Sequence, residues 1–359
     1  MTDTATRTTS LDRMRETQPE DTLIRLDRIR QINRGYVTNP YDKLLSEQFD
    51  AMRENQMAFD PDDPVSVKAC RKRGLLVIGE AGSGKSTAIS RILGKAKGLD
   101  SYCDGEGGLI KPLVSMKAPK PLTIRFFAET GLASLGYPIV SGQRSETQTW
   151  SFFLEQLEER EALWLFVDEM QHLMRTAGFT AKTDITDLVK NLLQLERWPL
   201  MCIFAGVGEL AQFLRYDKRQ IDDRTTKVRF DPLRIGPDTR KIVTMIAGVI
   251  TRHAEMVPGE GIDTEEFANR LLLASSGAWG TAIMFVREAI FAALRQGRET
   301  VKVEDFVAFY RQATGCLPDQ NIFAAAVWKD IKPGNAVYDY IQKHEEEEKR
   351  LNENGGRKR

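Results

Sequence analysis

The sequence predicts an α/β fold, in which a parallel five-stranded sheet flanked by helices is followed by an all-helical lid domain. From Gly74 to about Leu233, short apolar runs alternate with amphipathic stretches, which is typical of alternating strands and helices. After about residue 236 the strand signal disappears, whereas the helical periodicity continues. The chain is therefore expected to consist of a sheet-containing core and a helical lid.

Length and composition are those of an ordinary globular protein. At roughly 150 residues per domain, 359 residues correspond to about two domains. Lys plus Arg and Asp plus Glu both number 51, which excludes coating of nucleic acid by overall charge but permits a local basic stripe. The four cysteines and three histidines are scattered, so the sequence contains no zinc-ribbon spacing and no dense disulfide framework.

The sequence shows no signal for membrane targeting. The polar N-terminus lacks the apolar segment of a signal peptide. The longest apolar stretches, 162–167 and 201–207, are far shorter than the roughly 20 residues that cross a bilayer. We therefore expect a cytoplasmic protein with reduced thiols and no membrane partner.

The N-terminal region is expected to hold little of the core. Residues 1–22 are polar and aperiodic, which predicts a disordered arm. Residues 23–64 predict a helical segment and linker, because an amphipathic pattern is broken near Gly35 and Asn39-Pro40 and ends at the turn-forming PDDP sequence.

The core is expected at 65–235. Its five predicted strands are the apolar runs 74–78, 113–118, 163–167, 201–207 and 228–233. A helix at 145–159 opens with a capping box from Ser145 to Gln148. The next helix carries apolar residues on one face, namely Ile185, Leu188, Val189, Leu192 and Leu195.

The lid is expected at 236–315, with helices at 238–254, 263–275, 279–296 and 303–313. A capping box from Asp263 to Glu266 is predicted to begin the second of them. Residues 316–359 are expected to form a tail that could bind a partner, with four anchors spaced as in a peptide, Asn321, Phe323, Trp328 and Tyr338.

The strongest motif is Gly79-Glu80-Ala81-Gly82-Ser83-Gly84-Lys85-Ser86, which matches the phosphate-binding pattern GxxxxGK[ST]. An apolar strand precedes it and an amphipathic helix follows it, as a P-loop requires. The glycines let backbone amides turn toward a phosphate, and the helix N-terminus adds partial positive charge. We expect Lys85 to reach the β- and γ-phosphates of a nucleotide and Ser86 to hold Mg²⁺.

A second motif is the apolar run that ends in Asp168-Glu169. A buried strand of this kind delivers a carboxylate to the edge of a sheet. We expect Asp168 to hold the Mg²⁺ shell and Glu169 to act as general base toward water. The gap after the P-loop contains another strand and two helices, so an extra strand is expected between the P-loop strand and the Asp168 strand. This arrangement is typical of AAA+ and RecA-type (ASCE) P-loop NTPases.

An arginine finger, which a neighbouring subunit contributes to stabilise the transferring phosphoryl group, is expected before the last strand. Arg224 is the first candidate and Arg219 the second. The alternative interpretation is an exposed arginine paired with Asp222 or Asp223.

The chain resembles the TniB/TnsC family of AAA+ ATPases, which regulate DNA transposition. The matching text, within about residues 25–315, comprises the Asn39-Pro40 segment, GEAGSGKST, PLVSMKAPKP, ETGLASLGYP, VDEMQHL, FAGVGE and RQIDDR. The resemblance implies ATP and Mg²⁺ as cofactors, and ATPase roles for Gly84, Lys85, Ser86, Thr87, Asp168, Glu169 and Arg224. It also implies a ring or helical filament on duplex DNA, which links a TniQ-type target-selection factor to a DDE-type transposase.

The sequence departs from the family pattern at two sensor positions. The fourth strand ends in Phe204-Ala205-Gly206, where a polar residue is common. In the lid, Gly280 is followed by Thr281 instead of a basic residue. Both departures favour slow hydrolysis, as in a switch or timer.

The candidates for DNA contact lie near loops that AAA+ rings direct toward their axis. They are Lys117, Lys120, Thr123, Arg125, Arg175 and Lys182. A lone lysine is equally often only solvated, and His172 is interpreted as a packed or capping residue.

The prediction is an ATP-dependent, DNA-binding regulator of transposition. Two alternatives remain open. The first is a helicase loader or general DNA-remodelling ATPase with the same core, and the second is a nucleotide-gated adaptor with little hydrolysis.

Overall fold

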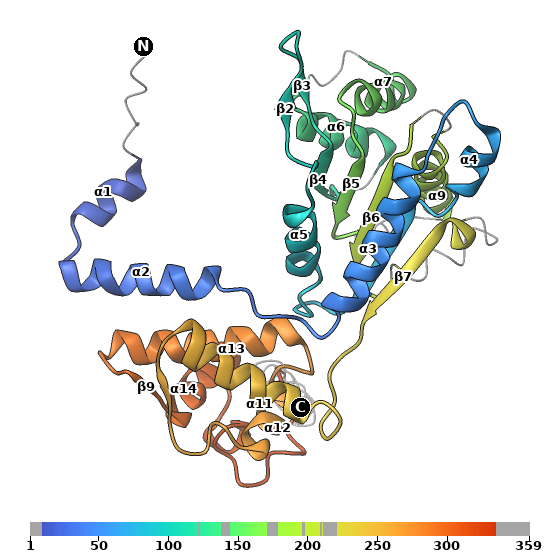
Figure 1. The fold of residues 1–359 in the computed structure, drawn as a ribbon. Helices are drawn as coiled ribbons and strands as arrows, with labels where there is room; N and C mark the ends of the chain where they lie inside the picture. The colour runs from blue at the N-terminus through green and yellow to red at the C-terminus, as the bar shows by residue number, and fades with distance from the viewer. Residues whose placement is uncertain are drawn as a thin grey trace, which may run out of the picture. The chain divides into compact units, whose positions relative to one another are not determined.

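The computed structural model describes residues 9–120, 123–137, 144–170, 179–195, 198–208, 210 and 221–334. The chain divides into two compact units (Figure 1). Asn39–Pro232 forms the core unit, and Met1–Thr38 together with Leu233–Arg359 forms the helical unit. The boundaries differ from the expected linear order, because the helical unit takes residues from both ends of the chain.

The core unit contains a five-stranded parallel sheet with the strand order β4-β5-β6-β1-β7. The strands are β1 (Gly74–Gly79), β4 (Leu113–Lys117), β5 (Trp164–Asp168), β6 (Met201–Gly206) and β7 (Thr225–Phe230). All five predicted strands are thus present. β7 starts and ends three residues before the predicted run 228–233, and Pro232 lacks the amide that a longer ladder would need.

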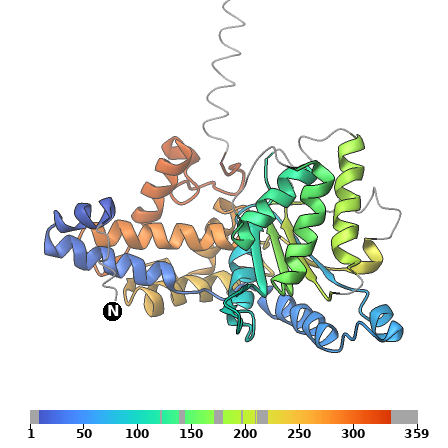
Figure 2. The same ribbon diagram turned by 90° about the horizontal axis from the view of Figure 1, so that it is seen from above.

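Helices cover both faces of the sheet (Figure 2). α3 (Asp42–Met57) and α5 (Lys85–Lys95) pack on one face, and α6 (Ile124–Leu135), α7 (Glu146–Glu159) and α9 (Phe179–Leu193) pack on the other. The side chains of β1 alternate between the two faces, as this layering requires. Leu75 and Val77 belong to the apolar cluster with α3 and α5, whereas Leu76 and Ile78 belong to the cluster with α6, α7 and α9. The core unit also contains α4 (Pro64–Ala69) and the small hairpin β2–β3 (Tyr102–Cys103, Leu109–Ile110).

Two predicted capping boxes have different outcomes. The box that begins α7 is confirmed, since Ser145 N donates to Gln148 Oε1 at 2.9 Å and Gln148 N donates to Ser145 Oγ at 3.2 Å. The box predicted for Asp263 and Glu266 is wrong by one residue. α12 (Glu265–Ala274) is capped by Thr264, whose hydroxyl accepts from Phe267 N at 3.2 Å.

The helical unit has one apolar core. It contains α2 (Glu20–Arg34), α11 (Thr239–Gly248), α12, α13 (Trp279–Arg295) and α14 (Val303–Thr314). The two-residue strands β8 (Val257–Pro258) and β9 (Thr300–Val301) pair in parallel, which the sequence did not predict. A π-helical turn, η2 (Val249–His253), continues α11.

The N-terminal segment differs from the expected arm and linker. α1 (Ser10–Glu16) begins at a capping box between Thr9 and Asp12. α2 starts within the predicted arm and belongs to the helical unit, because Ile32 is buried and Arg28 donates to both carboxylate oxygens of Glu299 at 2.7 and 2.9 Å. The predicted segment 23–64 is therefore divided between the two units after Thr38.

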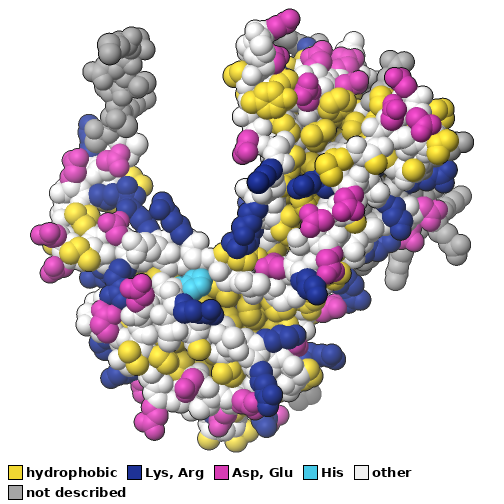
Figure 3. Space-filling view, viewed as in Figure 1, with side chains coloured by type: hydrophobic (Ala, Val, Ile, Leu, Met, Phe, Trp, Pro, Cys, Tyr) yellow, Lys and Arg dark blue, Asp and Glu magenta, His cyan; other side chains and the backbone are white. Residues whose placement is uncertain are grey.

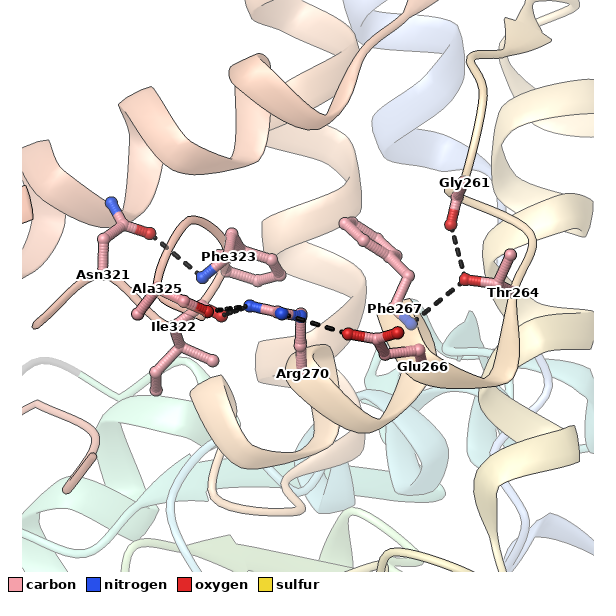
Figure 4. A network of polar contacts seen from close by, with 9 residues as sticks. All are labelled: Gly261, Thr264, Glu266, Phe267, Arg270, Asn321, Ile322, Phe323 and Ala325. Carbon is pink, nitrogen blue, oxygen red and sulfur yellow. Dashed lines mark hydrogen bonds and ion pairs between the residues drawn. The ribbon is translucent and has the colours of Figure 1, made fainter. Parts of the chain in front are cut away.

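The first part of the predicted tail packs on the helical unit (Figure 4). Arg270 of α12 donates to the carbonyl oxygens of Ile322 at 2.7 Å and Ala325 at 2.9 Å. Phe323 and Trp328 are 4% and 5% exposed. Asn321 Nδ2 donates to Val307 O on α14 at 2.9 Å. These three predicted anchors therefore bind this chain's own helices, while Tyr338 lies outside the described residues.

In the part of the chain that the structure describes, no single helix has the length and apolarity to cross a membrane. The sharply bent pair α12–α13 meets that criterion only when the two helices are taken together.

Candidate phosphate-binding site

The predicted P-loop joins β1 to α5, and its backbone requires glycine at three positions. Gly82 and Gly84 have φ angles of 75° and 89°, in the left-handed region that glycine adopts without strain. A Cβ on Gly79 would lie 2.7 Å from the Cβ of Phe230 on β7. The loop is thus a tight turn packed against the neighbouring strand.

The first turn of α5 presents backbone amides to the loop. Gly84 is the N-cap and provides no side-chain hydrogen bond. The first amides of a helix have no acceptor within the helix and carry its partial positive charge. The residues of this turn are Lys85, the half-buried Ser86 and the exposed Thr87. The turn can therefore donate to an anion.

Lys85 is buried, with 8% of its surface exposed. Its Nζ donates to three oxygens of its own loop, the carbonyls of Gly79 (2.6 Å) and Glu80 (2.9 Å) and the hydroxyl of Ser83 (3.3 Å). Burial lowers the pKa of Lys85, and the carboxylates of Asp168, Glu169 and Glu80 oppose that shift. The ammonium is thus a desolvated cation close to the predicted Mg²⁺ ligand Asp168 and the predicted general base Glu169.

Asn39 also contacts the loop, which the sequence analysis did not predict. Its side chain is 4% exposed, and Nδ2 donates to the carbonyl oxygen of Ser83 at 2.9 Å. The only signal in the sequence was the Asn39-Pro40 dipeptide in the text that resembles the family. Its distance along the chain from the P-loop gave no reason to place it in the site.

Asp168 ends β5, and the chain bends sharply at Glu169. Glu169 has a φ of 61°, a left-handed conformation that costs a non-glycine residue about 1–3 kcal/mol. Asp168 Oδ1 accepts from Glu169 N at 2.8 Å, and Met170 N donates to Ala205 O on β6 at 2.9 Å. These bonds fix the bend that presents the two half-buried carboxylates at the carboxyl edge of the sheet.

A strand does lie between β1 and β5 in the sheet, as expected, but it is not the strand that lies between the two motifs in the sequence. β6 occupies that place, and it follows Asp168 along the chain. The strand within the gap between the two motifs, β4, lies at the outer edge of the sheet.

The residues at this edge fit a Mg²⁺–nucleotide. A buried lysine, left-handed glycines and open helix amides suit phosphate oxygens. The Ser86 hydroxyl and the Asp168 carboxylate are the hard oxygen ligands that Mg²⁺ takes along with phosphate and water. Among the described residues, no group of three or more His, Cys, Asp or Glu side chains could hold a metal by itself.

Comparison with known families agrees with this geometry. Residues 65–235 match the model of a family described as "TniB: Bacterial TniB protein". The resemblance to the TniB family is confirmed over this segment. This segment contains both the P-loop and the Asp168–Glu169 bend. No curated protein matches the sequence.

Three solved structures of Cdc6 and ORC proteins have a similar AAA+ P-loop fold. Cdc6p from Pyrobaculum aerophilum has a TM-score of 0.56 at 14% identity, covering 81% of this chain and 72% of that chain. Aeropyrum pernix ORC2, described with ADPNP and ADP, has a TM-score of 0.54 at 12% identity, covering 77% and 70%. Aeropyrum pernix ORC1, described in complex with DNA, has a TM-score of 0.50 at 14% identity, covering 79% and 67%. The predicted AAA+ α/β fold is thereby confirmed.

The two sensor positions carry no charged side chain in the structure, as in the sequence. Phe204 and Ala205 are buried on β6, which ends at Gly206. In the helical unit, α13 begins at Trp279, and its first turn contains Gly280 and Thr281. Neither segment provides a charged side chain to a phosphate.

Arg224 lies at the amino ends of the strands, which we call the amino edge of the sheet, whereas the P-loop lies at their carboxyl ends. It ends a 3₁₀ turn, η1 (Asp222–Arg224), directly before β7, and Thr225 pairs with Gly74 at the start of β1. With the Gln194 amide oriented to face it, Gln194 Oε1 accepts from Arg224 Nε at 3.2 Å and Nη2 at 2.8 Å. Asp222 forms an ion pair with Lys227. Arg219 lies outside the described residues.

The candidate DNA-contacting residues differ in their availability. Lys117 and Lys120 are exposed at the end of β4. Thr123 caps α6 by accepting from Phe126 N at 3.1 Å, and Arg125 pairs with Glu129 at 2.9 Å. Arg175 and His172 lie outside the described residues, and the side chain of Lys182 is not described either. Among the described candidates, the two lysines are thus exposed cations, whereas the Arg125 guanidinium is engaged in an ion pair.

The helical unit contains a cavity of about 380 Å³. Residues 36–38, α11, η2 and Trp279 line it. His253 Nδ1 and Trp279 Nε1 are buried without a hydrogen-bond partner. Burial, followed by the charges of Arg287 and Arg252, lowers the pKa of His253. Figure 3 shows this histidine in cyan beside basic side chains; it is the sole histidine among the described residues.

Proposed function

We propose that this protein is an ATP-dependent, DNA-binding AAA+ regulator of transposition. It assembles as a ring or helical filament on duplex DNA and links a TniQ-type target-selection factor to a DDE-type transposase. The observation that carries the proposal is a buried P-loop lysine close to the carboxylates of Asp168 and Glu169, inside a segment that matches the TniB family model.

The geometry of the site supports the proposed ATPase roles. Lys85 binds the β- and γ-phosphates, and the first-turn amides of α5 donate to the same groups. Ser86 and Asp168 hold Mg²⁺, which when bound neutralises phosphate charge. Glu169 orients and deprotonates the attacking water. ORC2, which shares the fold, is described in complexes with ADPNP and ADP.

Arg224 is proposed to act on the site of a neighbouring subunit. β1 extends over about 16 Å between Gly74, which is level with Thr225, and Gly79 at the P-loop. Arg224 therefore cannot reach the P-loop of its own core. An oligomer that places this edge against the next subunit's P-loop would complete each site, so hydrolysis would depend on assembly.

DNA binding is proposed to use Lys117 and Lys120. Lys117 pairs in register with Asp168, and Ala118 N donates to Asp168 O at 2.8 Å. Backbone pairing between β4 and β5 thus links the proposed DNA-binding loop to the proposed Mg²⁺ ligand. Because each subunit offers few phosphate contacts, firm binding needs many subunits on one duplex. ORC1, which shares the fold, is described in complex with DNA.

Electron microscopy of the protein with duplex DNA and a non-hydrolysable ATP analogue tests the proposal. We expect rings or filaments that require both nucleotide and DNA, and DNA affinity that falls with salt according to the phosphates neutralised. Identical particles with and without nucleotide would refute it. Adding a TniQ-type factor and a DDE-type transposase should yield co-assembly on these particles.

A pair of double variants makes the DNA test specific. Lys117→Glu with Lys120→Glu should abolish DNA binding and leave ATP affinity unchanged. Lys43→Glu with Lys72→Glu makes the same charge change at two other exposed positions of the core unit and should retain binding. Equal loss in both double variants would assign the effect to overall charge.

A nucleotide-gated adaptor with little hydrolysis is the second candidate. The apolar end of β6 and the uncharged first turn of α13 favour it. Steady-state phosphate release from the DNA-bound assembly distinguishes the two. Turnover that Glu169→Gln abolishes supports the ATPase, whereas nucleotide-dependent assembly without turnover supports the adaptor.

A further inference from the structure

Asn39 holds one peptide unit of the P-loop in place. Its Nδ2 donates to the carbonyl oxygen of Ser83 at 2.9 Å. That carbonyl belongs to the same peptide unit as the amide of Gly84, and in a trans peptide the C=O and N–H bonds point in opposite directions. Fixing the Ser83 carbonyl toward Asn39 therefore fixes the Gly84 amide toward the other side of the loop.

The orientation of the Asn39 amide is set by its neighbours. Asn39 Oδ1 accepts from Tyr41 N at 3.1 Å, so the nitrogen of the amide must be the atom that faces Ser83. Asn39 N donates to Asp42 Oδ2 at 2.8 Å, and Asp42 N donates to Asn39 O at 3.0 Å. The backbone N–H, the backbone carbonyl and Oδ1 of Asn39 are thus engaged in one turn, which leaves Nδ2 for Ser83.

The turn that carries Asn39 is anchored firmly in the core unit. It leads into α3, whose Leu45, Phe49 and Met52 are buried against the sheet. Tyr41 Oη donates to Asp231 O at 3.0 Å, and the Tyr41 ring lies 5.0 Å from that of Phe230. Elements outside the P-loop therefore hold the Asn39 side chain, whose Nδ2 is the donor to Ser83.

We propose that Asn39 is a positioning residue of the phosphate site, which sets the Gly84 peptide so that its amide donates to a nucleotide phosphate. This inference rests on the proposed nucleotide-binding function. Gly84 has a φ of 89°. Because glycine adopts positive and negative φ about equally readily, its own backbone preference does not fix this conformation. The buried Asn39 side chain provides the constraint before the ligand arrives, which lowers the cost of ordering the loop.

Calorimetric titration with Mg²⁺–ATP tests the inference on four forms of the full chain: wild type, Asn39→Ala, Asn39→Asp and Tyr41→Phe. Tyr41→Phe is the matched control, because it also removes one donor to a backbone carbonyl from the same turn but leaves the P-loop bond intact. Asn39→Ala should weaken ATP binding about 10-fold, and Tyr41→Phe should change it less than 2-fold.

The Asn39→Asp variant provides a pH signature that a merely structural role would not give. Its ionised carboxylate cannot donate to Ser83 O, so ATP binding at pH 8 should be at least as weak as in Asn39→Ala. Burial raises the pKa of such a carboxyl, and its protonated form donates again. The affinity relative to wild type should therefore recover as the pH falls toward 5.5, and Asn39→Ala should show no such recovery.

Each result decides between the claims. Wild-type affinity in both Asn39 variants would overturn the positioning role and leave the proposed function intact. Equal losses in Asn39→Ala and Tyr41→Phe, with lower melting temperatures in both, would also overturn it, since the turn would then act only through stability. Absence of Mg²⁺–ATP binding by the wild type would refute the proposed function and the inference together.

Discussion

The two edges of the core sheet hold their cations in different ways. At the carboxyl edge, Lys85 is buried near acids, and the backbone around it takes left-handed conformations at Gly82, Gly84 and Glu169. At the amino edge, Arg73 is 3% exposed and donates to the carbonyl oxygens of Cys70, Leu195 and Trp198. The first edge keeps strained, desolvated groups that suit a ligand, whereas Arg73 links loops of the fold.

Arg224 also lies at the amino ends of the strands, and its replacement is expected to have a large effect on hydrolysis. It lies level with Arg73, and the neutral amide of Gln194 is one of its partners. Arg224→Ala should lower DNA-stimulated hydrolysis by about 10³-fold and leave the ATP affinity of the monomer nearly unchanged. Phosphate release and ATP titration measure the two effects.

Mixing variants shows whether Arg224 acts between subunits. A mixture of Arg224→Ala and Lys85→Ala chains contains interfaces with one intact site, so it should recover part of the activity. Normal assembly without recovery would argue against Arg224 and transfer the role to Arg219.

Arg73→Met should affect stability instead of binding. The methionine keeps the apolar length of the side chain but removes the Arg73 donor from the carbonyl oxygens of Cys70, Leu195 and Trp198, of which Trp198 O still accepts from Leu200 N. We expect the free energy of unfolding to fall by about 2–4 kcal/mol, measured by urea denaturation. ATP affinity at a temperature where the variant is folded should stay within 2-fold of wild type. A large loss of ATP affinity in a stable Arg73→Met protein would contradict the division between the two edges.

The sequence predicted the carboxyl edge far better than the rest of the molecule. The P-loop and the Asp168 strand are local signals, in which an apolar run and the following residues define both structure and chemistry. Asn39 was missed because its bond to Ser83 joins residues far apart in the sequence. Phe323 and Trp328 were interpreted as anchors for a partner, because an apolar side chain in a polar tail looks alike whether it binds another protein or, as here, its own helices.

A smaller effect is expected from pH in the helical unit. Burial lowers the pKa of His253 in the folded state, and Arg287 and Arg252 add to that shift. The folded state therefore binds fewer protons than the unfolded state near the unfolded pKa of about 6.5. Wild-type stability should fall as the pH drops through this range, and His253→Gln should lack that part of the loss. Urea denaturation at pH 7.5 and 5.5 measures the effect. An equal loss of unfolding free energy in wild type and His253→Gln would exclude His253 as the cause.

Equilibrium binding of Mg²⁺–ATP to Lys85→Ala and Glu169→Gln tests the central claim most directly, because both residues lie at the carboxyl edge but have different proposed roles. Lys85→Ala removes charge-assisted bonds to phosphate and should weaken binding by about 100-fold or more. Glu169→Gln keeps the shape of the site, so it should bind ATP as wild type does and lose about 10²- to 10⁴-fold in hydrolysis. Wild-type ATP affinity in Lys85→Ala, or wild-type turnover in Glu169→Gln, would contradict the assignment of this edge as the ATPase site.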